Sequence, residues 1–415
     1  MTETDSVGRQ RLKYVATIND EALGEETDPD YEIQYVDIGN VDFSGGIRGT
    51  TTYRFADAPS RARRRVRDGD VIISTVRTYL QSISPVHTPP DNLIVSTGFA
   101  VVRPRRGFFD ASFCKYALRE PSFLAEVERR SVGVSYPAIN ASDLGDIHIY
   151  LPAASDQQKI AKFLDRETSR LDALVAAKEE LLARLVEKGR ALTTNAVTRG
   201  LDHSVPVRNS GVSWLGEIPS HWKTRRVAWL FRERDERGET DLPLLEVSIN
   251  AGVVLREFST DRIEGTASDF NTYKIARKGD IVFNKMRMWQ GAVGVSPQDG
   301  LVSPDYTVAA SVGPLTPEFA GQLFRTAMFS AECARRSHGI TWDRLRLYWE
   351  GFRDIELPLP DQNEQRAILK FIVEETSKLN AMRAATEESI TLLKERRAAL
   401  IKEAVTGALN LGDAV

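Results

Sequence analysis

The sequence predicts an α+β protein in which two strand-rich domains alternate with two long helices that pair as an antiparallel coiled coil with pseudo-twofold symmetry. The main observation is an internal repeat, because residues 146–202 align without a gap on residues 354–410. A repeat of this length indicates a domain duplication, since solenoid repeats span only ~20–50 residues. The predicted divisions are a first domain (1–150), a first helix (151–202), a linker with a second domain (203–356) and a second helix (357–415).

The globular segments repeat more faintly than the helices. Residues 67–73 (RDGDVII) correspond to residues 277–283 (RKGDIVF), and residues 129–133 (RRSVG) correspond to residues 335–339 (RRSHG). Most other positions differ in their chemistry. The sequence therefore predicts one scaffold with two different surfaces.

Runs of β-branched and apolar residues bounded by Gly, Pro, Asp and Asn predict the strands of both domains. In the first domain, helical spacing of apolar residues also predicts one helix over about 110–130. The expected strands are 33–38, 71–76 and 93–102 in the first domain and 243–249, 280–283 and 301–310 in the second, which has a helix near 317–335.

The duplicated helices have clear start and stop signals. Ser155 with Gln158, and Asp361 with Glu364, each fit a capping box that follows a Leu-Pro pair. Gly200 and Gly407 are suitable terminators. Apolar residues recur in heptads along both helices, in one line (Leu164, Leu171, Leu185, Leu192; Ile372, Leu379, Leu393, Leu400) and a second (Ile160, Leu174, Leu181; Ile368, Met382). We expect the helices to pair with each other, although each could instead cover its own domain.

Composition limits the setting in which the protein works. A net charge of −3 excludes a globally basic nucleic-acid binder but allows local basic strips. Two cysteines supply neither a disulfide framework nor a metal cluster, which favours a reducing compartment. The polar start and the absence of an apolar run of ~18 residues predict a cytoplasmic protein with no signal peptide and no membrane span.

Catalytic motifs are missing from the sequence. It contains no G-x-x-x-x-G-K-[ST] loop, no G-x-G-x-x-G after a strand and no Asp/Asn-Pro-Pro-Tyr motif of amino-methyltransferases. The five histidines are scattered and have no metal-ligand spacing. We therefore expect no catalytic residue, no metal site and no cofactor on this chain.

Three regions carry side chains suited to binding nucleic acid. Arg61–Arg67 holds five arginines, and arginine matches both phosphate and guanine with two parallel hydrogen bonds, although a solvated charge run is a simpler interpretation. The segments after the shared strand, 74–81 and 284–290, mix arginine, glutamine and an aromatic residue. The loops after the short helices, 131–136 and 337–342, combine glycine and small hydroxyl residues with Tyr or Trp. The candidate DNA-binding residues are Arg61, Arg63, Arg64, Arg65, Thr75, Arg77, Tyr79, Gln81, Ser135, Tyr136, Lys285, Arg287, Trp289, Gln290, His338, Thr341, Trp342 and Arg344.

The chain resembles the DNA specificity subunits of type I restriction-modification systems. The most specific elements are the repeated segments LPAASDQQKIAKFLDRETSRLD and LPLPDQNEQRAILKFIVEETSKLN, and SGVSWLGEIPSHW at 210–222. The first half departs from the pattern, because it lacks this last segment and begins near residues 11–14 (RLKY). The resemblance implies two target recognition domains, each reading one half of an asymmetric, bipartite site in double-stranded DNA.

The resemblance also implies the partners. A specificity subunit is non-catalytic and assembles with two methyltransferase subunits, which bind S-adenosylmethionine, and with restriction (motor-nuclease) subunits, on which ATP and Mg are expected. The triplet Glu-Thr-Ser recurs unaltered in the two helices, which suggests equivalent docking surfaces for two copies of one partner. The candidate partner-binding residues are Glu167, Thr168, Ser169, Glu375, Thr376 and Ser377. The alternatives are a cytosolic two-headed protein-binding scaffold and a self-contained nuclease or methylase.

Overall fold

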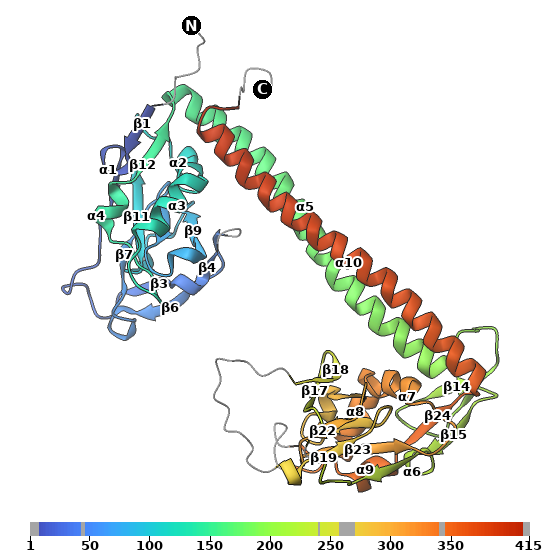
Figure 1. Ribbon diagram of the computed structural model, residues 1–415. Coiled ribbons are helices and arrows are strands. Elements are labelled where there is room, and N and C mark those ends of the chain that lie inside the picture. Colours follow the sequence, from blue (N-terminus) through green and yellow to red (C-terminus); the bar gives the residue numbers. More distant parts are fainter. Residues whose placement is uncertain (1–7, 43–45, 240, 257–269, 340–344, 410–415) are drawn as a thin grey trace. The chain divides into compact units, whose positions relative to one another are not determined.

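The computed structural model describes residues 8–42, 46–239, 241–256, 270–339 and 345–409, which fall into two units (Figure 1). Unit 1 comprises Met1–Glu180 and Thr386–Val415, and unit 2 comprises Leu181–Ala385. Each unit therefore combines one strand-rich domain with a segment of each long helix. Among the described residues, no helix is long and apolar enough to cross a membrane, and no group of three His, Cys, Asp or Glu side chains is placed to hold a metal ion.

Unit 1 contains two four-stranded sheets, with strand orders β6-β3-β10-β7 and β2-β11-β8-β9. All pairs in these sheets are antiparallel except β3 with β10. A further pair, β1 with β12, brings the start of the domain to its end. The strands are β1 (Gly8–Arg11), β2 (Ala16–Ile18), β3 (Glu32–Val36), β4 (Val41–Asp42), β5 (Gly46–Ile47), β6 (Thr51–Arg54), β7 (Ala62–Arg65), β8 (Val71–Ser74), β9 (Ile83–Pro85), β10 (Leu93–Ser96), β11 (Phe99–Pro104) and β12 (His148–Leu151). The helices are α1 (Leu12–Val15), α2 (Ala111–Ala117), α3 (Pro121–Arg130) and α4 (Ala141–Gly145), with short 3₁₀ turns η1 (Ile38–Asn40), η2 (Phe55–Asp57) and η3 (Thr78–Leu80).

Unit 2 repeats part of this topology. Its four-stranded sheet, β16-β23-β20-β21, matches β2-β11-β8-β9 strand for strand, and β15 pairs with β24 as β1 pairs with β12. The strands are β13 (Val207–Asn209), β14 (Glu217–Pro219), β15 (Lys223–Arg226), β16 (Phe231–Arg234), β17 (Leu245–Ser248), β18 (Gly252–Leu255), β19 (Lys274–Ala276), β20 (Ile281–Asn284), β21 (Val293–Val295), β22 (Gly300–Val302), β23 (Tyr306–Ser311) and β24 (Glu356–Leu359). The helices are α6 (Val227–Leu230), α7 (Pro317–Phe324), α8 (Ala327–Arg336) and α9 (Trp349–Arg353), with η4 (Phe270–Thr272) and η5 (Met288–Gln290).

The prediction of a single short helix in each domain is wrong, because each is two helices. In unit 1 the chain breaks between α2 and α3, where Pro121 opens α3 and the Glu120 carboxylate accepts hydrogen bonds from the amides of Ser122 and Phe123. In unit 2 the Thr326 hydroxyl caps α8 in the same way. The predicted strands 93–102 and 301–310 are likewise each two strands separated by a turn.

The long helices are α5 (Ala154–Arg199) and α10 (Gln362–Val405). The Asp361 half of the predicted capping box is confirmed, since its carboxylate accepts hydrogen bonds from the amides of Asn363 and Glu364 at 2.8 and 2.9 Å. The Glu364 carboxylate instead accepts a hydrogen bond from the Trp222 indole nitrogen at 2.8 Å. Ser155 does not cap α5, because it lies inside the first turn. Both predicted terminators, Gly200 and Gly407, follow their helices with left-handed backbone angles (φ of 73° and 77°).

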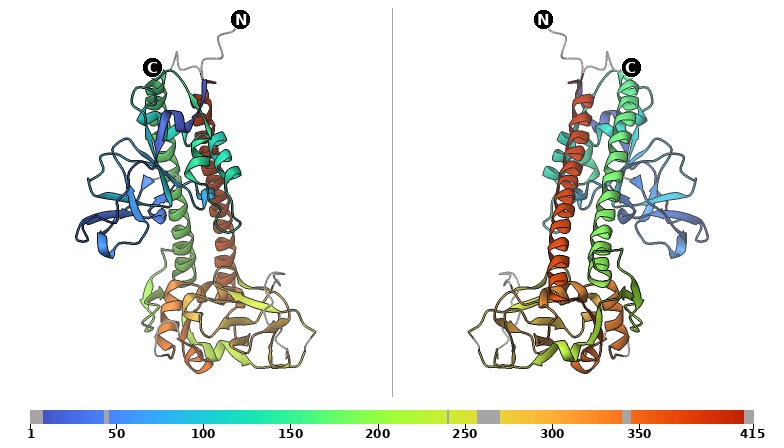
Figure 2. Two further views of the ribbon diagram at one scale, coloured as in Figure 1. Left: turned by 90° about the vertical axis from the view of Figure 1, so that its left-hand side faces the viewer. Right: turned by 90° about the vertical axis from the view of Figure 1, so that its right-hand side faces the viewer.

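The two long helices pack against each other antiparallel within each unit (Figures 1 and 2). In unit 1, Lys394 pairs with Glu179 and Arg397 pairs with Asp172. Residue numbers therefore increase along α10 in the direction in which they decrease along α5. In unit 2, Ala196 and Val197 of α5 share a core with residues from the start of α10. The expected pairing of the helices is therefore confirmed.

The first predicted heptad line is buried or half-buried along its length, whereas the second is exposed in the middle of the helices. Leu164, Leu171, Leu185 and Leu379 are at most 8% exposed, whereas Leu174, Leu181 and Met382 are 51%, 39% and 51% exposed. The prediction for the second line is thus wrong in the middle of the helices. Its end residues, Ile160 and Ile368, are buried because each packs into the core of a strand-rich domain.

The missing lead-in of the first half has little effect on its scaffold. Residues 8–18 form β1, α1 and β2, as residues 223–234 form β15, α6 and β16. The segment 210–222 is an addition specific to unit 2, where Leu215, Ile218 and Trp222 pack on the helix pair.

Candidate functional site

The shared Arg-x-Gly-Asp turn before β8 and β20 supports the scaffold. The Asp70 carboxylate accepts a hydrogen bond from the Arg67 amide at 2.7 Å and is bound by the Arg103 guanidinium at 2.8 and 2.9 Å. These hydrogen bonds, which Arg103 donates to Asp70, raise the pKa of Arg103. In unit 2, the Asp280 carboxylate accepts a hydrogen bond from the Arg277 amide and one from Nε of Arg234, which lies on β16 and not on the strand that corresponds to β11. In both units the aspartate of this motif fixes the turn before the strand and binds an arginine of the same sheet.

The loop after β8 places Arg77 and Tyr79 on the surface. Thr75 is held at the strand end, where its hydroxyl and its amide both donate to the Gly98 carbonyl. Arg77 then adopts the left-handed conformation (φ 52°, ψ 50°), which non-glycine residues rarely occupy. Both Arg77 and Tyr79 are exposed, so they are available to a ligand.

The loop after α3 lies against this segment. Val132 and Ala138 exchange two backbone hydrogen bonds, so residues 133–137 project as a tight tip that carries the exposed Ser135 and Tyr136. The hydroxyls of Thr78 and Ser131 are 2.8 Å apart and join the two loops. The Arg77 guanidinium lies 4.8 Å from the centre of the Tyr136 ring. Two loops that the sequence predicted separately thus form one surface.

A groove of about 750 Å³ runs beside these loops, and it is the candidate site of unit 1. Arg61 and Tyr136 lie at its walls with Arg77, and the apolar side chains of Val76 and Leu80 contribute to the lining. It is also lined by Asp37, Ile38, Gly39, Val41 and Ser82. Arg61 Nη2 lies 3.5 Å from Asp37 Oδ2. Sequence reasoning missed Asp37, because an acidic residue at a strand end carries no signal by itself.

The arginine run does not form one patch. Strand β7 alternates its side chains, so Arg63 covers the Phe55 ring at 4.6 Å and Arg64 points toward the interior, where burial lowers its pKa. Arg65 is exposed, and Arg67 is ion-paired with Glu21. Among the five arginines, only Arg61 lines the groove.

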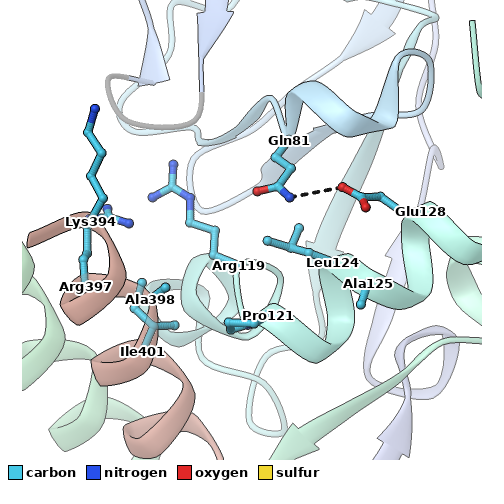
Figure 3. Close-up of a pocket in the computed structure, with 10 residues that line it drawn as sticks. All are labelled: Gln81, Arg119, Pro121, Leu124, Ala125, Glu128, Lys394, Arg397, Ala398 and Ile401. Carbon is cyan, nitrogen blue, oxygen red and sulfur yellow. Dashed lines mark hydrogen bonds between the residues drawn. The ribbon is translucent and has the colours of Figure 1, made fainter. Parts of the chain in front are cut away.

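Gln81 faces a different hollow from Arg77. Its side-chain amide donates a hydrogen bond to the Glu128 carboxylate at 3.2 Å. This hollow, of about 310 Å³, lies between α3 and the last part of α10 within unit 1, and Arg119, Lys394 and Arg397 line it from opposite sides (Figure 3). Gln81 therefore joins the loop after β8 to α3 and lies beside the last part of α10.

Unit 2 brings the equivalent loops together. The Leu347 amide donates to the Lys285 carbonyl, and His338 exchanges two backbone hydrogen bonds with Arg346. Arg287 occupies the same place after β20 as Arg77 after β8, and it is exposed. Trp289 corresponds to Tyr79, and its indole nitrogen donates to the Met286 carbonyl. His338 is exposed, while Thr341, Trp342 and Arg344 lie outside the described residues.

The arginine, glutamine and aromatic residues of segments 74–81 and 284–290 were expected at matching places, and for the glutamines this expectation is wrong. Gln290, which is exposed, occupies the last residue of η5, as Leu80 does in η3. Gln81 instead matches Gly291, and both have left-handed backbone angles. The loops after β8 and β20 thus share the position of the arginine and the aromatic residue but not that of the glutamine.

The repeated Arg-Arg-Ser motif closes a helix in both units. Arg129 and Arg130 at the end of α3 pair with Glu126, and Arg335 and Arg336 at the end of α8 pair with Glu332. Hydrogen bonds from Arg129 and Arg130 lower the pKa of Glu126 to about 2. The following serine, Ser131 or Ser337, donates its hydroxyl to the carbonyl four residues before it. These arginines therefore hold the loop that follows.

The recurring Glu-Thr-Ser triplet has a mixed role. Thr168 is 4% exposed, and its hydroxyl donates to the Leu164 carbonyl, while the hydroxyl of the half-buried Thr376 donates to the Ile372 carbonyl. Ser169 and Ser377 are exposed at equivalent positions. Glu167 and Glu375 are partly exposed and pair with basic residues three positions on, Arg170 and Lys378. The threonine hydroxyls bind carbonyls of their own helices, whereas the exposed serines and the partly exposed glutamates form an accessible surface.

The repeated Ala-Val-Thr segment is explained by packing. Ala196 and Val197 are buried in the core of unit 2, and Ala404 and Val405 are buried in the core of unit 1. The end of each long helix thus completes a domain core. Recurrence of this segment therefore gives no support to a docking surface.

Comparison with known proteins finds similarity to one family of DNA specificity domains. Residues 57–184 match the model of the "Type I restriction modification DNA specificity domain". A putative type I restriction enzyme MjaX specificity subunit of Methanocaldococcus jannaschii is 23% identical over 167 residues, which are 39% of this chain and 37% of that protein. The match thus spans less than two fifths of the length of this curated relative.

Two solved structures share the fold over nearly the whole chain. One is a chain of a type I R-M system studied for complex assembly and conformational transition, with a TM-score of 0.74, 21% identity and coverage of 99% of this chain and 100% of that chain. The other is the HsdS subunit from Thermoanaerobacter tengcongensis, with a TM-score of 0.54, 21% identity and 98% of both chains covered. At this identity the likeness shows the fold alone.

Proposed function

We propose that this chain, which belongs to the type I restriction-modification specificity subunits, reads two half-sites in double-stranded DNA, one with each unit, and has a non-catalytic role in its complex. Its membership confirms the resemblance predicted from the sequence. In unit 1 the reading surface is the groove beside Arg77 and Tyr136, and in unit 2 it is the loop that carries Arg287 and Trp289.

The observation that carries this proposal is the recurrence of one loop pair with one exposed arginine. In both units the loop after a central strand is held against the loop after a short helix, by the Thr78–Ser131 contact in unit 1 and by the Lys285–Leu347 hydrogen bond in unit 2. Arg77 and Arg287 stand three residues after the end of their strands. The surrounding side chains differ, as two different target sequences require.

The chemistry of the groove suits DNA. An arginine fork makes two hydrogen bonds to guanine O6 and N7 in the major groove, and aromatic side chains contact bases and sugars. The other exposed arginine of the groove, Arg61, can contact either a base or a phosphate. A net charge of −3 fits a protein that confines its DNA contacts to such local surfaces.

The proposed partners are methyltransferase subunits, which supply S-adenosylmethionine, and restriction subunits, which supply ATP and Mg chemistry. We place the methyltransferase contact on the exposed side of the paired helices, at Glu167 with Ser169 and at Glu375 with Ser377. The equivalence of these positions in the two repeats predicts that each binds one copy of the same partner.

The test is methylome sequencing of cells that express the chain with its methyltransferase subunit. Arg77→Ala and Arg287→Ala should each relax base choice at a single position, in different half-sites, because one arginine fork contributes ~1–3 kcal/mol of discrimination. Arg11→Ala and Arg226→Ala are matched controls. They occupy equivalent positions on β1 and β15 beside Asp146 and Asp354, belong to neither loop pair, and should leave the site unchanged.

Two outcomes would contradict the proposal. A uniform loss of methylation at all sequences would make Arg77 and Arg287 phosphate contacts without a role in reading. An unchanged methylated site in both variants would show that these loops do not read DNA bases. A salt titration of binding distinguishes this proposal from the alternative of a protein-binding scaffold, since DNA binding weakens steeply as the salt concentration rises.

A further inference from the structure

Asp37 and Arg61 form an acidic–basic pair inside the groove of unit 1. Both line the groove, and Asp37 Oδ2 lies 3.5 Å from Arg61 Nη2. Their side chains are 39% and 57% exposed, so both can meet a ligand. The distance exceeds that of an ordinary hydrogen bond, and an exposed ion pair of this kind is weak. The ion pair with Asp37 therefore leaves the Arg61 guanidinium able to bind a ligand.

Asp37 is held in place by the backbone around it. Its carboxylate Oδ1 accepts hydrogen bonds from the Ile38 amide at 2.8 Å and the Tyr35 hydroxyl at 3.3 Å. Asp37 is also the N-cap of η1, in a reciprocal capping arrangement with Asn40. A fixed carboxylate thus presents its second oxygen, Oδ2, toward Arg61. A capping role alone would not require this oxygen to face the groove.

The donors of Arg61 and the acceptor of Asp37 match the major-groove pattern of a guanine–cytosine base pair better than that of any other. Across the major groove, guanine–cytosine presents two adjacent acceptors, N7 and O6 of guanine, followed by one donor, N4 of cytosine. An arginine fork takes the two acceptors, and a carboxylate oxygen takes the donor. Guanine O6 and cytosine N4 are themselves hydrogen-bonded and so lie ~3 Å apart, close to the separation of Arg61 Nη2 and Asp37 Oδ2. Adenine–thymine alternates acceptor and donor and adds a methyl group, so it offers no adjacent acceptors to the fork.

We infer that Asp37 and Arg61 together read one guanine–cytosine pair in the half-site of unit 1. Arg61 donates to guanine N7 and O6, and Asp37 accepts from the cytosine N4 amino group. This inference rests on the proposed function, because it assigns two residues of the same groove to one base pair. It predicts that the half-site read by unit 1 contains a guanine–cytosine pair whose identity depends on both side chains.

The test uses Asp37→Asn and Arg61→Ala in the complex with the methyltransferase subunit. Asparagine caps a helix as well as aspartate does, but its amide nitrogen cannot accept a hydrogen bond from cytosine. Both variants should relax the same position of the methylated site, and preference for guanine–cytosine there should fall about five-fold or more. Arg54 and Asp57 form another exposed pair in unit 1 and do not line the groove. Arg54→Ala and Asp57→Asn should therefore change nothing.

A base analogue gives a second readout. When 7-deazaguanine replaces guanine at that position of the duplex, binding by the wild-type complex should weaken, because the analogue lacks the N7 acceptor. Binding by the Arg61→Ala complex should be insensitive to the same replacement. Fluorescence anisotropy with labelled duplexes measures both, and thermal unfolding of the variants verifies that they fold.

Three results would overturn the inference. They are relaxation of different positions by the two variants, an unchanged site in Asp37→Asn, and equal sensitivity of the wild-type and Arg61→Ala complexes to 7-deazaguanine. The Arg77→Ala variant separates this failure from failure of the proposed function. If Arg77→Ala relaxes one position while Asp37→Asn relaxes none, the groove reads DNA but Asp37 does not take part.

Discussion

The Arg77 guanidinium lies 4.8 Å from the centre of the Tyr136 ring, and this contact joins two loops that are far apart in the sequence. Arg77 has a left-handed backbone, which costs ~1–3 kcal/mol for a residue with a side chain and persists only where the surroundings impose it. The Thr78–Ser131 hydroxyl contact and the Val76–Ala138 bridge supply those surroundings. The backbone of Arg77 is thus fixed by contacts within unit 1.

The first prediction concerns the aromatic partner of Arg77. Tyr136→Ala should weaken discrimination in the half-site of unit 1, because the guanidinium loses a contact of about 0.5–1 kcal/mol that orients it. Tyr136→Phe keeps the ring and should retain near wild-type discrimination. Competition binding with duplexes that differ at one base measures the effect. Equal losses in both variants would show that the hydroxyl, and not the ring, matters.

The scaffold was largely predictable because its sequence pattern occurs twice in the chain. The ungapped repeat 146–202 predicted two long helices, and both form and pair within each unit. The Arg-x-Gly-Asp turn predicted a strand start and is found before β8 and β20. The breaks at residues 118–120 and 325–326 were not foreseen, because apolar spacing continues through them while only the capping residues signal a stop.

The site was predictable in part. Strand-end loops pointed to Arg77 and Arg287, since loops after shared strands differ where targets differ. The sequence did not reveal that Asp37 would lie beside Arg61, because this contact depends on the pairing of β3, β10 and β7. It also could not separate Arg61 from Arg63 and Arg64, because the alternation of side chains along β7 depends on where the strand begins.

The second prediction concerns acid stability of unit 2. Burial would raise the pKa of Glu332, but hydrogen bonds from Arg335 and Arg336 outweigh it and lower the pKa. Since the folded-state pKa lies below the ordinary value, the carboxylate stabilises the fold above the ordinary pKa of ~4.3 and loses this effect as the pH falls through the folded value.

Glu332→Gln should therefore lower the free energy of unfolding at neutral pH, and the difference from the wild type should shrink on acidification. All six tryptophans lie in unit 2, so their fluorescence in urea titrations reports on that unit. A difference that stays constant from neutral pH to strongly acidic pH would show that the carboxylate charge is not responsible.

The third prediction compares two leucines on α5 within unit 1. Leu164 is fully buried against the domain core, so Leu164→Ala should destabilise unit 1 by about 2–5 kcal/mol. Leu174 is 51% exposed, and Leu174→Ala should cost only about 0.5 kcal/mol or less. Urea unfolding followed by circular dichroism makes the comparison. Similar losses for both would mean that Leu174 is buried in solution.

The fourth prediction concerns the assembly. Native mass spectrometry of co-expressed proteins should give one copy of this chain with two methyltransferase subunits. Ser169→Arg and Ser377→Arg should each remove one copy, because each places a bulky charge on one exposed docking position. The buried Thr168 is unsuitable for this test, since its replacement would disturb the helix. A stable one-to-one complex with methylation of both half-sites would contradict the stoichiometry.

The most direct test of the central claim is an exchange of one recognition domain. Residues 212–356 would be replaced by the corresponding segment of a specificity subunit with a different target, and the methylome of cells carrying the hybrid and the methyltransferase subunit would be sequenced. Independent reading by the two units predicts that one half of the methylated site changes to that of the donor while the other half stays as it is. A change in both halves, or in neither, would contradict the account.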